Sequence, residues 1–104
     1  MKLRFTPRAT EDIFDIANYF SSRNEEAGQR VRAAIYECLQ TILLFPHSGR
    51  PQKLGQVRKF VTPRYKYLIY YLAEDSADEI VVLNVKHPAR EREHQDMESS
   101  RLGD

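Results

Sequence analysis

Cysteine and long apolar runs are scarce in this sequence, and each shortage excludes a class of protein. Cys38 is the only cysteine, which excludes an intrachain disulfide and any cluster of cysteines around a structural metal. His47 and His94 lack the spacing of metal ligands. We therefore expect a chain that works in a reducing cytoplasm and needs no metal or other cofactor.

No stretch of the sequence is suited to a membrane. The first five residues, Met1-Lys2-Leu3-Arg4-Phe5, do not form the apolar segment of a signal peptide, and no later run approaches the ~20 apolar residues that span a bilayer. The sequence predicts a chain that is neither exported nor embedded in a membrane. With 104 residues, 41% of them hydrophobic and 30% charged, it is expected to fold around one core.

Acidic residues are missing from one long segment. The formal net charge is only +1, which argues against a chain that coats nucleic acid by bulk electrostatics. Between His47 and Ala73, however, there is no acidic residue, and six residues are basic: Arg50, Lys53, Arg58, Lys59, Arg64 and Lys66. This uneven distribution predicts a positive surface that faces an anionic partner.

The first half of the chain has helical periodicity. Residues 2–5 alternate as a short strand does, and Thr6-Pro7 ends that strand and starts a helix. An apolar stripe predicts that this helix runs from Pro7 to Ser22. Asn24 begins a second amphipathic helix, which Pro46 ends. The short connection predicts an antiparallel helical hairpin, and the prolines and glycines of residues 46–56 predict a loop.

The second half has the period of strands. Residues 57–62, 65–72 and 80–86 are rich in β-branched and aromatic side chains and predict a three-strand antiparallel meander. The order β-α-α-β-β-β predicts an α+β fold in which the helical hairpin packs on a small, mainly antiparallel sheet. We assign residues 1–92 to this domain. Residues 93–104 are polar, and we expect them to form a mobile tail or to bind a partner.

The alternation of strands also sorts individual side chains. Arg58 and Lys59 are adjacent, so they must point to opposite faces of the sheet. Tyr70 is expected on one face, and on the other we expect three tyrosines that belong to the core: Tyr65, Tyr67 and Tyr71. Cys38 lies on the apolar stripe of the second helix, which predicts a buried and unreactive thiol.

Four short motifs follow one another along the chain: Phe5-Thr6-Pro7-Arg8-Ala9 with Asp12, Ile16 and Tyr19; Phe45-Pro46-His47-Ser48-Gly49-Arg50-Pro51; Tyr67-Leu68-Ile69-Tyr70-Tyr71; and Val85-Lys86-His87-Pro88-Ala89-Arg90. In this order they resemble the ParE/RelE superfamily of bacterial toxins, in its ParE-like branch. The resemblance covers residues 2–92. It implies the toxin of a type II toxin–antitoxin system, active in growth inhibition and plasmid stabilisation. It also implies a hetero-oligomer in which the partly disordered arm of a cognate antitoxin wraps the toxin.

The resemblance leaves two targets open, because ParE-like members inhibit DNA gyrase and RelE-like members cleave messenger RNA in the ribosome. Cleavage needs basic side chains and a general acid or base that converge. By alignment with RelE-like toxins, Tyr67 stands in place of an arginine, Gln52 in place of a glutamate and Pro88 in place of a tyrosine. We therefore favour a non-enzymatic gyrase inhibitor. A ribosome-dependent endoribonuclease and a non-toxic relic that binds only the antitoxin remain as alternatives.

Candidate residues follow from these hypotheses. For target binding they are Arg50, Arg58, Arg64, His87 and Arg90. For a divergent nuclease site they are Lys59, Arg64, Lys66, His87 and Arg90. The antitoxin arm is expected along a sheet edge or in the groove between the helical hairpin and the sheet.

Overall fold

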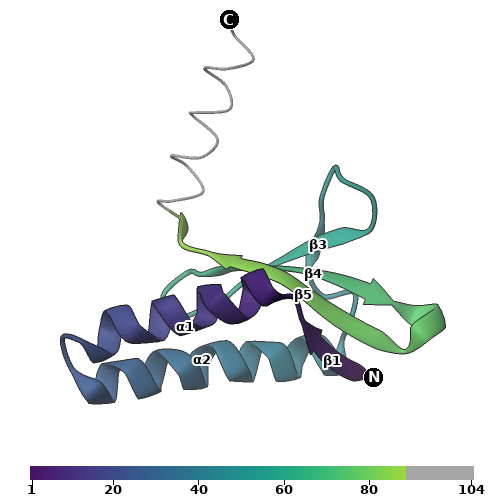
Figure 1. Ribbon diagram of the computed structural model, residues 1–104. Helices are drawn as coiled ribbons and strands as arrows, with labels where there is room; N and C mark the ends of the chain where they lie inside the picture. The colour runs from purple at the N-terminus through teal and green to yellow at the C-terminus, as the bar shows by residue number, and fades with distance from the viewer. Residues whose placement is uncertain (89–104) are drawn as a thin grey trace, which may run out of the picture.

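Two helices and five strands make up the part of the chain that the computed structural model describes, residues 1–88 (Figure 1). The elements are β1 (Lys2–Phe5), α1 (Pro7–Ser21), α2 (Glu25–Leu44), β2 (Arg50–Pro51), β3 (Val57–Val61), β4 (Leu68–Glu74), a short 3-10 helix η1 (Asp75–Ala77) and β5 (Glu79–Lys86). Neither α1 nor α2 is long and apolar enough to cross a membrane.

The strands form one sheet in the order β1-β5-β4-β3-β2. β1 is parallel to β5, and all other neighbours are antiparallel. Both helices lie on the same side of the sheet, so its other face has no helix over it within residues 1–88 (Figure 1). The predicted α+β fold, a helical hairpin on a mainly antiparallel sheet, is confirmed.

Side-chain caps explain where the helices begin. The Thr6 hydroxyl accepts a hydrogen bond from the Ala9 amide at 3.0 Å, and Pro7 occupies the first helical position. The Asn24 side chain accepts from the Glu26 amide at 2.9 Å and from the Ala27 amide at 3.4 Å. Both predicted helices are confirmed, with ends within one residue of the expected ones.

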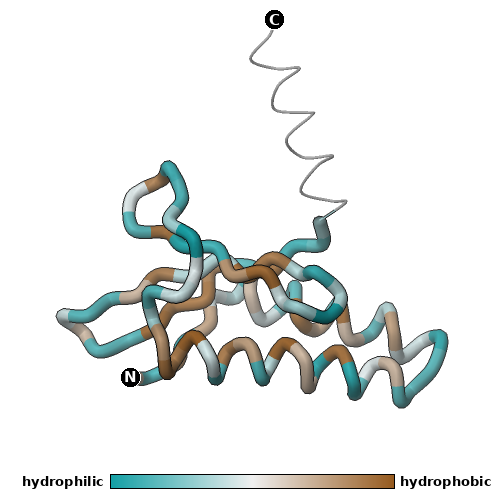
Figure 2. Tube along the Cα trace, turned by 180° about the vertical axis from the view of Figure 1, so that it is seen from behind, coloured by the Kyte–Doolittle hydropathy of each residue, from teal (hydrophilic) through white to brown (hydrophobic). Residues whose placement is uncertain are grey.

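The core lies between the helices and the sheet, where the apolar segments of both layers face each other (Figure 2). The largest of its fully buried apolar side chains come from α2 and from the central strands: Val31, Ile42, Ile69, Tyr71, Ile80 and Val82. Tyr67 and Tyr71 are buried and Tyr65 packs against the core, so the prediction for these three tyrosines is confirmed. Cys38 is buried too, as predicted.

Two strand predictions need correction. The prediction that residues 46–56 form a loop is wrong at Arg50–Pro51, because this pair adds an edge strand opposite Lys59 and Arg58. An edge strand accommodates proline, whose missing N–H does not interrupt the ladder. The fourth strand begins at Leu68 and not at Tyr65.

Left-handed backbone delays the start of β4. Tyr65 and Lys66 have φ angles of 68° and 58°, which a strand does not accommodate. The buried Thr62 side chain maintains this turn, because its hydroxyl donates to the Arg64 carbonyl at 2.5 Å and accepts from the Tyr67 amide at 2.9 Å.

A β-bulge shifts the alternation of β5. Tyr70 pairs with Asn84 but Tyr71 pairs with Val82, so Leu83 is the extra residue. The core side chains of β5 are therefore Ile80, Val82 and Val85, which do not follow a strict period of two. Beyond the bulge, Asn84 and Lys86 point away from the core.

Candidate target-binding surface

Four side chains form a row across the helix-free face of the sheet. The register pairs Arg50 with Lys59, Lys59 with Tyr70, and Tyr70 with Asn84, and directly paired residues share a face. The next residue in β4, Tyr71, is buried against the helices, which places Tyr70 and the rest of the row on the opposite face. The row therefore presents two cations and a phenol to a partner, with the half-buried side chain of Asn84 at its β5 end.

Lys86 extends this row at the β5 end. Its Nζ atom lies 5.7 Å from the centroid of the Tyr70 ring, within reach of a cation–π contact. Lys86 and Asn84 were not predicted as site residues. Strict alternation from Ile80 and Val82 would direct the side chains of Asn84 and Lys86 into the core. Because an asparagine and a lysine are rarely buried there, these two residues indicate a bulge between Val82 and Asn84.

Arg58 points to the opposite face from Lys59, as the alternation predicted, and its guanidinium binds the protein itself. One nitrogen, Nη1, donates to the carbonyl of His47 at 3.1 Å and to that of Gly49 at 2.9 Å. These bonds connect β3 to the turn before β2. Arg58 thus holds the segment that carries Arg50 and does not lie in the row.

Arg64 and Lys66 lie in the turn between β3 and β4, and both side chains are exposed. Because this turn is left-handed at Lys66, neither residue takes a place in the strand ladder. The structure does not bring them into the row with Lys59. Arg90 and His94 lie outside residues 1–88, so their predicted roles stay predictions.

His87 follows the end of β5 and lies against an aromatic ladder. Its ring centroid is 5.4 Å from that of Tyr67 in an edge contact. A tilted contact joins Tyr67 to Tyr65, and an edge contact joins Tyr65 to Phe20 on α1. The ladder fixes the exit of β5 relative to α1. It sets His87 at the end of the sheet, beyond the four paired residues of the row.

A groove of about 600 Å³ runs between α1 and the end of β5. Ile16 and Phe20 supply apolar wall, and His87 lies at one end. Asp12 on α1 also lines the groove and connects this helix to β5. Its carboxylate accepts a hydrogen bond from the Val85 amide at 3.0 Å and another from Nε of Arg8 at 3.1 Å. Asn84 also borders the groove. Its side-chain oxygen is buried without a hydrogen-bond partner among the described residues.

Cys38 offers no nucleophile to either surface. Burial, and secondarily the charge of Glu37, raises the pKa of its thiol. Over residues 1–88 no group of three or more histidine, cysteine or acidic side chains is placed to hold a metal ion.

This arrangement, a helical hairpin on one face of a mainly antiparallel sheet, is shared with solved structures from toxin–antitoxin systems. The chromosomal ParDE system of P. aeruginosa contains a chain that superposes with a TM-score of 0.71 at 20% identity, over 84% of this chain and 95% of that one. The toxin–antitoxin complex RelBE of E. coli matches with a TM-score of 0.62 at 19% identity, over 81% and 92%. At these identities the likeness shows the fold.

Sequence comparison shows the family. The model of the ParE toxin of the type II toxin–antitoxin system parDE matches residues 3–92. The Y4kP protein of Sinorhizobium fredii (strain NBRC 101917 / NGR234) is 29% identical over 87 residues, which are 83% of this chain and 86% of that protein. The chain belongs to the ParE toxin family.

Proposed function

We propose that this toxin arrests bacterial growth by binding and poisoning DNA gyrase, without an enzymatic activity of its own. The observation that carries the proposal is the composition of the row on the helix-free face. Arg50, Lys59, Tyr70 and Asn84 include no carboxylate and no imidazole. Cleavage of RNA at neutral pH needs a group that takes the proton of the 2′-OH, and the row supplies neither of these two common proton acceptors. A positive surface of this kind suits binding.

The second candidate is a ribosome-dependent endoribonuclease. It is favoured by one contact, the Lys86 ammonium close to Tyr70, because cations near a phenol could stabilise a phosphate and assist proton transfer. In that case Lys59 and Lys86 would contact the phosphate. His87, Arg64 and Lys66 would have to approach from the ends of the sheet.

We further propose that a cognate antitoxin occupies the groove between α1 and β5. The related ParDE and RelBE proteins are toxin–antitoxin systems. The groove combines apolar wall from Ile16 and Phe20 with charges of both signs. Burial of apolar surface should keep the affinity high at moderate salt, where purely ionic contacts are screened. A complex that dissociates entirely after a modest rise in ionic strength would contradict this placement.

Purified toxin separates the two activities. Added to gyrase and relaxed plasmid, it should block supercoiling or accumulate cleaved DNA, whereas toeprints on translating ribosomes should stay unchanged. Codon-specific cuts in ribosome-bound messages with normal supercoiling would establish the nuclease instead. Soluble chain that neither slows growth nor affects either assay would identify a relic that retains only antitoxin binding.

A further inference from the structure

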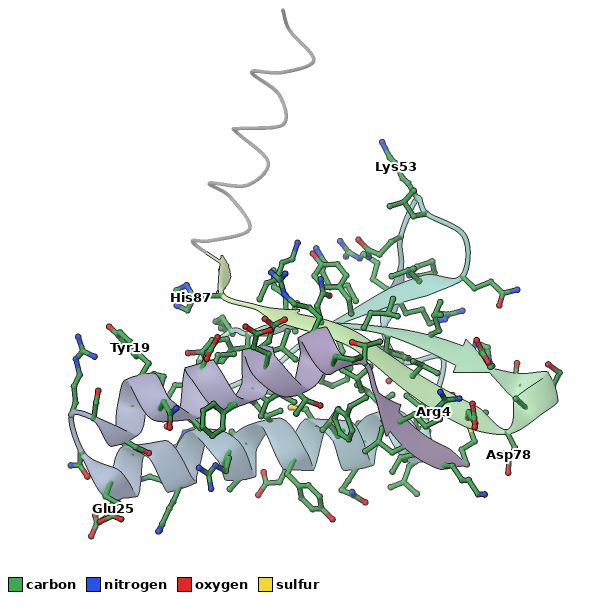
Figure 3. All side chains as sticks on the ribbon, in the orientation of Figure 1. Arg4, Tyr19, Glu25, Lys53, Asp78 and His87 are labelled. Carbon is green, nitrogen blue, oxygen red and sulfur yellow. The ribbon has the colours of Figure 1, made fainter. Side chains whose placement is uncertain are left out.

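The hairpin that joins β2 to β3 projects from the sheet on the side away from the helices. Figures 1 and 3 show this loop rising clear of the body, with Lys53 at its tip. The next residue, Leu54, is 79% exposed, the highest value among the large apolar side chains of residues 1–88. An apolar side chain at the end of a projecting loop gains nothing from the fold of the toxin itself.

The base of this hairpin is held rigidly. The Tyr71 hydroxyl, buried in the core, donates to the Pro46 carbonyl at 2.8 Å and accepts from the Gly49 amide at 2.9 Å. Gly49 is required there, since a Cβ atom would lie 2.7 Å from the Tyr71 hydroxyl oxygen. Arg58 adds two hydrogen bonds to the same segment. We call the hydrogen bonds by which Tyr71 and Arg58 hold residues 46–49 the latch.

The loop itself is also closed by backbone hydrogen bonds. The Gln52 amide donates to the Val57 carbonyl at 2.9 Å, and the Val57 amide donates to the Leu54 carbonyl at 3.2 Å. Gly55 takes the left-handed conformation, with φ of 54°, that the turn needs. A loop fixed in this way loses little conformational entropy when it binds a partner.

The charged side chains of the hairpin between β2 and β3 are all basic. No acidic residue occurs between His47 and Ala73, so Lys53 and Arg50 are not neutralised within the hairpin. Asp75, from the turn between β4 and β5, lies near the base, where its carboxylate is 3.6 Å from Nε2 of His47. The tip of the hairpin therefore keeps its positive charge.

We propose that residues 52–56 form a contact finger that inserts Leu54 into an apolar pocket with an acidic rim on the target protein. This deepens the proposed function by naming the part of the toxin that engages the target. A protein is favoured over nucleic acid because the loop carries a single cation, Lys53, and no aromatic ring. Binding to single strands depends on stacking platforms, and binding to duplexes depends on many phosphate contacts.

The decisive variant is Leu54→Gln in the full chain, with Leu44→Gln as its matched control. Leu44, at the end of α2, is 74% exposed, so both changes alter a solvated leucine. Leu54→Gln should raise the toxin concentration that halves gyrase supercoiling by about tenfold or more, as expected for an apolar anchor at an interface. Leu44→Gln should leave it within about twofold. Equal inhibition by both variants and wild type would overturn the finger.

Growth arrest in cells separates this inference from the gyrase proposal. If wild-type toxin arrests growth without affecting gyrase, the proposed function fails. If Leu54→Gln then fails to arrest growth while wild type and Leu44→Gln still do, the contact finger binds another protein target. Unchanged antitoxin affinity in both variants would show that each one folds.

A photo-cross-linking residue at position 54 identifies what the finger touches. With purified gyrase and plasmid, a protease-sensitive adduct with a gyrase subunit supports the inference, and a nuclease-sensitive adduct with DNA alone overturns it. Lys53→Glu tests the rim: its deficit relative to wild type should shrink as salt rises. No deficit at low salt would exclude an acidic rim.

Discussion

Removing one oxygen atom from Tyr71 should destabilise the whole toxin. Tyr71→Phe keeps the buried ring but deletes the two latch hydrogen bonds that the hydroxyl makes, at 2.8 Å to the Pro46 carbonyl and at 2.9 Å from the Gly49 amide. Leaving such buried groups unsatisfied costs about 1–3 kcal/mol. For a domain of this size each kcal/mol lowers the Tm by about 4–8 °C. A Tm lower by about 10 °C is therefore expected.

Circular dichroism melts of Tyr71→Phe and Tyr70→Phe make the comparison. Tyr70 precedes Tyr71 in the same strand but points to the helix-free face, so its hydroxyl contributes little to the core. Tyr70→Phe should change the stability by less than about 0.5 kcal/mol. If both variants melt within 2 °C or so of wild type, water replaces the Tyr71 hydroxyl at no cost and the latch does not hold the hairpin.

Three further experiments test other parts of the fold. Asp12→Ala should lower the free energy of unfolding by about 1–3 kcal/mol in urea titrations, because it leaves the Val85 amide without its hydrogen-bond acceptor. Arg8→Ala removes only the exposed partner of the ion pair and should lower the free energy of unfolding by less than about 1 kcal/mol. Equal losses in the two variants would contradict this difference. Asn24→Ala removes the cap of α2 and should cost about 1 kcal/mol; an unchanged urea midpoint would count against the cap. Native Cys38 should react with iodoacetamide far more slowly than in urea at the same pH, because a raised pKa leaves less thiolate; similar rates would show that the thiol is open to solvent.

Local signals were sufficient for the helices. The caps at Thr6 and Asn24 and the stop at Pro46 act through backbone groups within a few residues, so the sequence alone locates both helices to within one residue. In β4 the core side followed from alternation, which put Tyr71 inside and Tyr70 outside.

The edge strand and the bulge depend on contacts distant in sequence. Arg50–Pro51 can pair as a strand because the Tyr71 hydroxyl holds the preceding turn by a hydrogen bond from the Gly49 amide, 22 residues away in sequence. The bulge at Leu83 exists in the pairing of β5 with β4, and no local propensity encodes it. This is why Lys86 and Asn84 escaped prediction, and why Arg58, expected as a contact residue, has its guanidinium engaged within the protein.

The pairing of β1 with β5 sets the order in which the sheet can form. Lys2 lies opposite Glu79 and Phe5 opposite Val82, and within residues 1–88 β5 is the only strand beside β1. β1, which is synthesised before the other four strands, therefore cannot pair until β5 has been synthesised. Contacts so distant in sequence carry a large loop-closure entropy and form late. The helical hairpin can assemble while synthesis continues, but the sheet that carries the basic row is complete only after β5 has been synthesised.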